Sequence, residues 1–241
     1  MSSKGWSHFW KNPKHSFDKV MKISTTFYAS EMEKLFQLKP TDKVLDYGCG
    51  PGFLVDYLAD LHISVTGTDI NKSYVEQNKI NHPDSLFLHL SSDAHVNKET
   101  FEKQLMGTEF DFVVLLSITQ YLENETELDA IINNLRSYIK KTGKLIIADV
   151  IDSDTSAVRD AISLLLHCTK SGQPLVFFKF IIYLMFSDYR RLSKEVKLLK
   201  LSEQSIRQIA ERNMMDWSKI NDLTIHPSRT NYILTPKKSL I

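Results

Sequence analysis

Apolar residues along the chain follow two different spacings, and the changes between them predict its secondary structure. Residues 14–38 place apolar side chains mostly three or four positions apart, which predicts a helix. Pro40 prevents that helix from continuing, because proline lacks the amide hydrogen and its ring clashes with the preceding turn. Short apolar runs follow, and we expect a strand in each of them: 43–47, 63–69, 85–90, 110–117 and 143–151.

Segments of helical spacing separate these runs, and strands that alternate with helices predict a parallel sheet. The expected helices are 52–60, 72–80, 99–106 and 124–140. After residue 151 the alternation stops, because residues 153–200 contain apolar helical material without a run that reads as a strand. It returns in an expected helix at 201–213 and expected strands at 216–225 and 230–236.

Composition and charge place the chain among ordinary globular proteins. Hydrophobic residues make up 42% and charged residues 24% of the 241 positions, enough for a sizeable core. A formal net charge of +1 gives no reason to expect binding to nucleic acid. The two cysteines form no disulfide framework, and the N-terminal stretch lacks the apolar segment of a secretory signal, so we expect a cytoplasmic protein.

One apolar stretch, residues 175–186, stands out because Lys179 is its only charge. It is shorter than the roughly 18 residues that a membrane-spanning helix needs. The stretch can therefore be the wall of an apolar pocket, a buried helix or a dimer interface. Because several arginines and lysines follow it between residues 190 and 200, attachment to a membrane surface also stays open.

The first expected strand ends in the turn VLDYGCGPG (44–52), which leads directly into a helix. Gly48, Gly50 and Gly52 permit a tight turn and a close approach of a ligand to the backbone. A dinucleotide fingerprint starting at Gly48 would need glycine where Phe53 stands, and the Gly-Lys-Ser/Thr of a phosphate loop is missing. The turn therefore indicates a nucleotide-like ligand, but it carries neither of the two motifs that bind phosphates.

Three acids follow successive strands and indicate the same ligand. Asp46 precedes the turn, where a carboxylate would repel a phosphate and attract a cationic group. Asp69 ends the second strand, where it can accept both hydroxyls of a ribose. Asp93 follows the third strand and is placed to accept from an adenine amine. Together these acids predict a ligand with a ribose, an adenine and a positive amino group.

These residues, with FDFVVLLSITQYL (110–122), make the chain resemble the class I S-adenosylmethionine-dependent methyltransferases. The resemblance implies an α/β, Rossmann-like, mostly parallel seven-stranded sheet with helices on both faces. We expect four parts: an N-terminal helical lid (1–39), a core that binds S-adenosylmethionine (40–152), a helical cap inserted after the fifth strand (153–200), and a C-terminal helix and strands that complete the sheet (201–241).

The resemblance also implies roles for single residues in binding the cofactor. Asp46 would order the amino group, and Asp69 would hold the ribose. The methionine part would contact Gly48, Cys49, Gly50 and Ser117, and the adenine would contact Ile70, Ser92, Asp93 and Ala94.

Catalytic residues are less well defined by the sequence. Where many relatives carry a histidine pair after the fourth strand, this chain has Gln120 and Tyr121, which are poor bases at neutral pH. His95, His167 and His226 are the other candidates for a general base. We expect no metal, because the histidines and cysteines show no ligand spacing.

The expected function is methyl transfer to a small, apolar or aromatic acceptor, with oxygen favoured as the acceptor atom. The lid and the cap would recognise this acceptor, and Phe177, Phe178 and Phe180 would face it. Two alternatives remain: a protein of this fold that binds S-adenosylmethionine without transferring methyl groups, and a methyltransferase of lipids or membrane surfaces. A homodimer through the cap also stays open.

Overall fold

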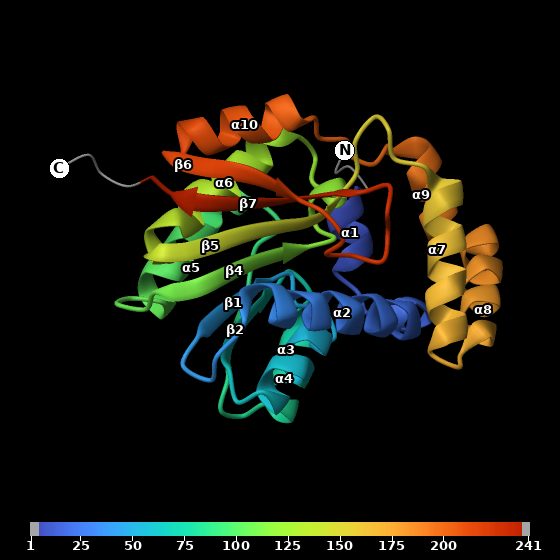
Figure 1. Cartoon of the computed structure of the whole chain (residues 1–241), viewed down its shortest axis with the longest axis horizontal. Helices are drawn as coiled ribbons and strands as arrows, with labels where there is room; N and C mark the ends of the chain where they lie inside the picture. Colours follow the sequence, from blue (N-terminus) through green and yellow to red (C-terminus); the bar gives the residue numbers. More distant parts are fainter. Residues whose placement is uncertain (1–4, 238–241) are drawn as a thin grey trace.

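A seven-stranded sheet forms the centre of the molecule, in the order β3-β2-β1-β4-β5-β7-β6 (Figure 1). The computed structural model describes residues 5–237. β7 alone points opposite to the other strands, pairing antiparallel with β5 and β6, while the remaining pairs are parallel; this confirms the predicted α/β, mostly parallel fold. The strands are β1 (Lys43–Tyr47), β2 (Ser64–Asp69), β3 (Leu86–His89), β4 (Phe110–Leu116), β5 (Ile139–Val150), β6 (Met215–Ile220) and β7 (Thr230–Pro236).

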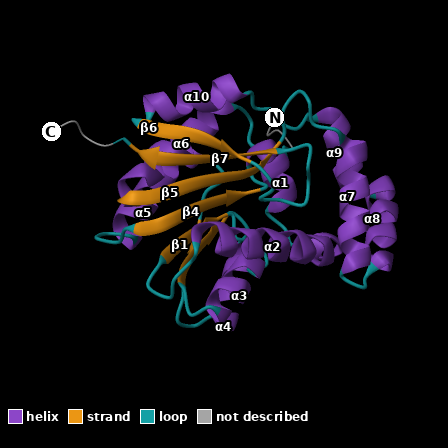
Figure 2. Cartoon of the chain, in the orientation of Figure 1, coloured by secondary structure: helices purple, strands orange, loops and turns teal. Residues whose placement is uncertain are grey.

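Helices cover both faces of the sheet and also stand beyond one of its edges (Figure 2). The α-helices are α1 (Trp6–Trp10), α2 (His15–Phe36), α3 (Phe53–Asp60), α4 (Lys72–Asn81), α5 (Asn97–Gln104), α6 (Glu125–Leu135), α7 (Ala157–Lys170), α8 (Pro174–Phe186), α9 (Asp188–Glu195) and α10 (Glu203–Arg212). Short 3₁₀ turns lie at η1 (Ala94–Val96), η2 (Thr119–Tyr121) and η3 (Arg136–Tyr138).

Two hydrophobic cores lie on opposite faces of the sheet because side chains alternate along each strand. Leu45 and Val113 pack into the core that α5, α6 and α10 cover. Val44 and Phe112, one position earlier on the same strands, pack into the core under α2, α3 and α4. Since both faces are covered, the central strands read as continuous apolar runs.

Two expected elements end earlier than their apolar patterns predict. The strand expected over 216–225 stops at Ile220, because its pairing with β7 ends at Asn231 and the chain then turns away. Leu223 and Ile225 are buried against neighbouring helices, so their apolar character reflects burial in a loop. The helix expected over 124–140 ends at residue 135, and β5 begins at residue 139.

The helices inserted after β5 face the carboxyl ends of the strands. In Figure 1, α7 and α8 stand side by side beyond that edge, and α2 extends across to meet them. The segment 153–200, expected as a cap, thus forms α7, α8 and α9. This arrangement encloses the crevice in which open α/β sheets bind ligands.

Candidate functional site

A cavity of about 600 Å³ lies between the carboxyl ends of the strands and the surrounding helices. Its wall includes the glycine turn after β1, the ends of β2, β4 and β5, and side chains from α1, α2, α7 and α8. The loop between β6 and β7 closes another side with residues 224–226 and Arg229. The cavity is therefore large enough for a cofactor and part of a small acceptor.

The glycine turn has a backbone that other residues could adopt only with strain. Gly48, Gly50 and Gly52 have φ values of 79°, 51° and 88°. A Cβ at Gly48 would overlap the side chain of Ile118, and one at Gly52 would lie 2.5 Å from the amide oxygen of Asn78. The amides of Gly48 and Cys49 both donate to the carbonyl of Thr68 at the end of β2. The turn is thereby fixed against the neighbouring strand.

Asp46 and Asp69, the two predicted cofactor acids, both line the cavity and are both buried. Burial, and secondly the charge of Asp69, raises the pKa of Asp46 to about 7. Burial also raises the pKa of Asp69 to about 6, although the amides of Asn71 and Gly50 donate to its carboxylate at 2.6 and 2.8 Å. Two buried carboxylates so close together favour a cationic ligand, which would relieve their repulsion.

The structure brings most of the other predicted cofactor residues to the same cavity. Cys49, Ile70, Ser92 and Ser117 line it. Ser117 lies at the end of β4 with a φ of 56°, and its hydroxyl donates to Asp149 at 2.6 Å.

Asp93 and Ala94, expected at the adenine edge, are not among the residues that line the cavity. The carboxylate of Asp93 instead accepts from the amide of His95, at 2.9 Å, and so caps η1. The carbonyl of the buried Ala94 accepts from Asn134 of α6. Ser91 and Ser92 are the residues of this loop that reach the cavity.

The candidates for catalytic residues differ in whether they line the cavity. Gln120, Tyr121 and His226 line the cavity, whereas His95 and His167 do not. His167 instead hydrogen-bonds the carbonyl of Ser163 on its own helix and packs against the ring of Phe27, with centroids 4.8 Å apart.

Gln120 and His226 each present a buried polar atom without a hydrogen-bond partner among residues 5–237. These atoms are Oε1 of Gln120 and Nδ1 of His226. Burial lowers the pKa of His226, and this effect outweighs the opposing charge of Asp149. A neutral imidazole that lines a cavity can accept a proton at its unprotonated ring nitrogen.

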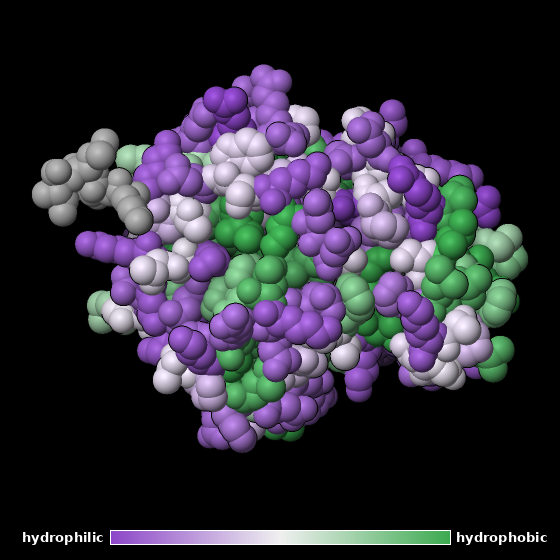
Figure 3. Space-filling view, in the orientation of Figure 1, coloured by the Kyte–Doolittle hydropathy of each residue, from purple (hydrophilic) through white to green (hydrophobic). Residues whose placement is uncertain are grey.

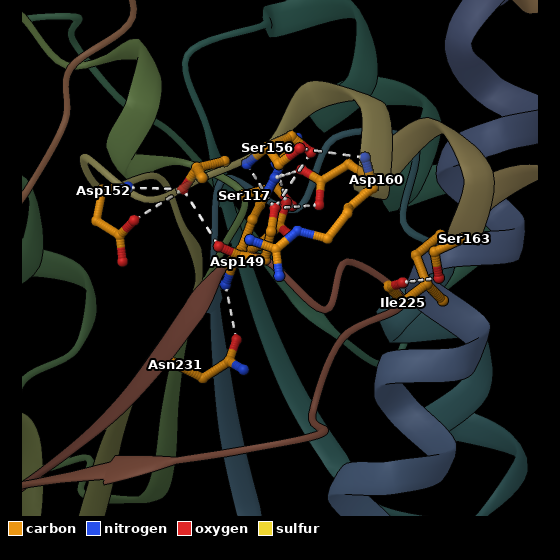
Figure 4. A network of polar contacts seen from close by, with 12 residues as sticks. Ser117, Asp149, Asp152, Ser156, Asp160, Ser163, Ile225 and Asn231 are labelled. Carbon is orange, nitrogen blue, oxygen red and sulfur yellow. Dashed lines mark hydrogen bonds and ion pairs between the residues drawn. The ribbon is translucent and has the colours of Figure 1, made fainter.

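A buried charged network that the sequence did not reveal includes Asp149 and Asp160 (Figure 4), and its charges act on His226. Arg229 donates to Asp149 at 2.7 Å and to Asp160 at 2.8 Å. Ser228 also donates to Asp160, at 2.6 Å. Although burial opposes the charge of Arg229, the two carboxylates hold its pKa above the ordinary value.

Asp149 faces the cavity because β5 is irregular at this point. The pairing of β5 with β7 shifts register between Ile147 and Val150, and Asp149 has a φ of 69°. Such a bulge turns a side chain away from its regular direction. The aspartate within the apolar run IIADV was the only hint in the sequence, because its side-chain partners, Ser117 and Arg229, are 32 and 80 positions away.

Aromatic and aliphatic side chains form the remaining wall. Trp10 packs edge to face against both Phe17 and Tyr121, and Tyr189 of α9 packs against Phe17. From α8, Phe180, Ile181 and Leu184 line the cavity.

The expectation that Phe177, Phe178 and Phe180 all face the acceptor is therefore wrong for two of the three. Phe177 packs with Val20 and Leu164, and Phe178 is 52% exposed. Successive residues of a helix point in different directions, so a continuous apolar run cannot face one pocket. Lys179 is exposed to solvent.

A comparison with models of protein families shows the family of the chain. The model of a methyltransferase domain matches residues 38–176. The chain belongs to this methyltransferase family. Its membership confirms the resemblance to the class I enzymes, whose methyl donor is S-adenosylmethionine.

Individual relatives of this methyltransferase are distant. The ubiquinone biosynthesis O-methyltransferase of Bartonella bacilliformis is 28% identical over 149 residues, which are 58% of this chain and 57% of that protein. The match thus spans just over half the length of that relative.

Solved structures show the same fold. An S-adenosylmethionine-dependent methyltransferase from Clostridium acetobutylicum has a TM-score of 0.59 at 11% identity, covering 93% of this chain and 97% of its own. A TehB-like methyltransferase from Corynebacterium glutamicum has a TM-score of 0.55 at 16% identity, covering 88% of each chain.

Two features are absent from residues 5–237. Within this range, no helix of the methyltransferase combines the length and the apolar character needed to cross a bilayer. The same residues contain no group of three acidic, histidine or cysteine side chains that could hold a metal ion.

Proposed function

We propose that this protein transfers a methyl group from S-adenosylmethionine to an oxygen atom of a small apolar or aromatic acceptor. One observation carries the proposal. A single cavity joins the glycine turn and the acids Asp46 and Asp69 to a neutral histidine, His226, and to an aromatic wall. Both halves of a methyl-transfer site thus share one enclosed space.

The residues at the glycine turn suit the cofactor by the chemistry of their side chains. Asp46 would hold the ammonium group of the methionine part, because its buried carboxylate gains most from a cation. Asp69 would accept from the ribose hydroxyls, since each carboxylate oxygen keeps a free lone pair after bonding one amide. Ile70 would pack against the adenine, and Ser91 and Ser92 would meet its edge.

His226 and Gln120 are the residues that we assign to the acceptor. When bound, the cofactor supplies a methyl group activated by its sulfonium. As the acceptor oxygen bonds to that methyl carbon and the carbon–sulfur bond breaks to leave a neutral thioether, Nδ1 of His226 would take the hydroxyl proton. Oε1 of Gln120 can accept a hydrogen bond from a polar group of the acceptor and so orient it.

The relative from Bartonella bacilliformis is named an O-methyltransferase, which supports oxygen as the acceptor atom. The aromatic wall of Trp10, Phe17 and Phe180 supports an apolar acceptor.

The alternative function is that of a protein that binds S-adenosylmethionine without transferring methyl groups. A screen with cofactor labelled in its methyl group, against phenols and catechols that carry apolar substituents, separates the two. Labelled product supports transfer, and tight cofactor binding without product from any of them supports the alternative function.

Replacing Asp46 with asparagine is expected to weaken S-adenosylmethionine binding about 10- to 100-fold, because a hydrogen bond between two charged groups is lost. The wild-type protein should also bind more weakly as the pH falls below about 7, since Asp46 then takes up a proton and loses its charge. Calorimetric titration across this pH range measures both effects.

The free Asp46→Asn variant should unfold at a temperature no lower than the wild type, because the substitution removes a poorly solvated carboxylate. Equal binding by the variant and the wild type at pH 8 would contradict the assignment of Asp46 to the ammonium group.

Replacing Phe180 with alanine is expected to raise the KM for the acceptor about 10-fold or more, because it removes an aromatic wall of the cavity. Affinity for S-adenosylmethionine should stay within about twofold, since Phe180 lies on the acceptor side. Phe178→Ala is the matched control, because Phe178 is the same residue type on the same helix and points outward. Similar KM changes in both variants would show that the helix, and not this wall, determines acceptor binding.

A further inference from the structure

Helix α8 is apolar on every side, yet none of its residues is buried. A helix of this composition normally has partners all around it. Here one side faces the cavity through Phe180, Ile181 and Leu184. Within residues 5–237, nothing covers the opposite side. The outer side of α8 therefore lacks the partner that its composition calls for.

The uncovered side is a continuous apolar surface, which we call the outer face. On α8, its residues recur three, four or seven positions apart and so share one side of the helix. Helix α7, which packs beside α8, adds residues spaced four apart. All are more than half exposed: Val158, Ile162 and Leu166 on α7, and Leu175, Phe178, Ile182, Met185 and Phe186 on α8. Figure 3 shows hydrophobic residues gathered along this edge of the molecule.

Exposed cations outnumber exposed acids around the outer face. Between residues 157 and 187, Arg159, Lys170 and Lys179 are all exposed. The only acid in this stretch, Asp160, is buried and paired with Arg229. The following helix α9 adds the exposed cations Arg190, Arg191 and Lys194 against two acids, one of which pairs with Arg191. Exposed cations thus lie on the two helices that form the outer face and on the helix that follows them.

We propose that the outer face binds an anionic lipid surface. Apolar side chains would enter the boundary between headgroups and acyl chains, and the cations would pair with the anionic headgroups. A second copy of the chain fits less well, because two outer faces would bring like charges together. This proposal goes beyond methyl transfer and does not depend on it.

Sedimentation with vesicles tests the proposal on the full-length protein. We expect binding to vesicles of phosphatidylglycerol and phosphatidylcholine, and much weaker binding to phosphatidylcholine alone or at high salt. The double variant Phe178→Glu/Ile182→Glu should reduce the partition coefficient at least about tenfold. Replacing Lys170 and Lys179 with glutamine should reduce it about fivefold per lysine, without altering any apolar contact.

The matched control is Ile80→Glu/Met106→Glu, because both residues are strongly exposed but lie on α4 and after α5. This variant should bind vesicles like the wild type. Titration with S-adenosylmethionine checks the fold of every variant, so loss of vesicle binding is distinguishable from loss of the site. Absence of binding by the wild type would overturn the proposal, and so would equal loss in the control. A dimer in sedimentation velocity that Phe178→Glu/Ile182→Glu dissociates would instead assign the outer face to a second copy.

Discussion

Replacing His226 with asparagine is expected to lower kcat by about 10²- to 10⁴-fold, the usual contribution of a general base. The affinity for S-adenosylmethionine should hardly change, because His226 lies in the loop between β6 and β7, whereas the cofactor acids lie at the ends of β1 and β2. So large an effect is expected because of the burial and the hydrogen bonding of the imidazole. Its Nδ1 is buried in the cavity wall without a partner, so it is free to take the proton of an acceptor hydroxyl.

The pH profile distinguishes this role from a structural one. Burial lowers the pKa of His226 below its ordinary value of 6.5, so the neutral form dominates at neutral pH. For the wild type, kcat should therefore fall only as the pH drops through a value below 6.5, and it should be flat above that value. The asparagine variant lacks the imidazole, so this acidic limb should disappear when S-adenosylmethionine is saturating.

His167→Asn is the matched control, because His167 was an equal candidate in the sequence but lies outside the cavity lining. We expect its kcat to stay within about threefold of the wild type. Steady-state kinetics with an acceptor from the labelled-methyl screen measures both variants. If His226→Asn kept most of its activity and the same acidic limb, another group would have to accept the proton.

Replacing Arg229 with methionine is expected to lower the free energy of unfolding by about 3–5 kcal/mol, because it leaves two buried carboxylates without their counter-charge. Asp149 and Asp160 are 3% and 5% exposed, so water cannot replace the guanidinium. The substitution also removes hydrogen bonds, because Arg229 connects the loop before β7 to Asp149 on β5 and to Asp160 on α7. Urea denaturation at neutral pH measures the change.

Arg207→Met provides the control for this prediction. Arg207 forms an ion pair with Glu211 at 2.9 Å, but both side chains are more than half exposed. Exposed pairs contribute about 0–1 kcal/mol, so the control should unfold almost like the wild type. A second variant, Arg229→Met with Asp149→Asn and Asp160→Asn, should recover part of the lost stability because the buried charges are gone. Equal stability of Arg229→Met and the wild type would mean that the network does not hold the loop in place.

Predictions from the sequence succeeded where the relevant residues are neighbours in the chain. The glycine turn, the end of the second strand and the helices between strands follow from local spacing, and the structure has them within a few residues. The predictions failed where apolar residues buried in a loop resembled the apolar pattern of a strand. The residues 221–225 look like a continuing strand because Leu223 and Ile225 are apolar, but those side chains fill gaps beneath helices instead.

The sequence by itself determined the sheet, the glycine turn and the convergence of Asp46 and Asp69. Parallel strands necessarily bring their carboxyl ends to one edge, so residues that end successive strands must meet there. Only the tertiary structure decided the acceptor side of the cavity. Arg229 meets Asp149 across 80 positions of chain because β7 returns antiparallel beside β5, and His226 takes its place through the same return. Which side of α8 faces the cavity also depends on how that helix packs against α2 and α7, since its own sequence is apolar all around.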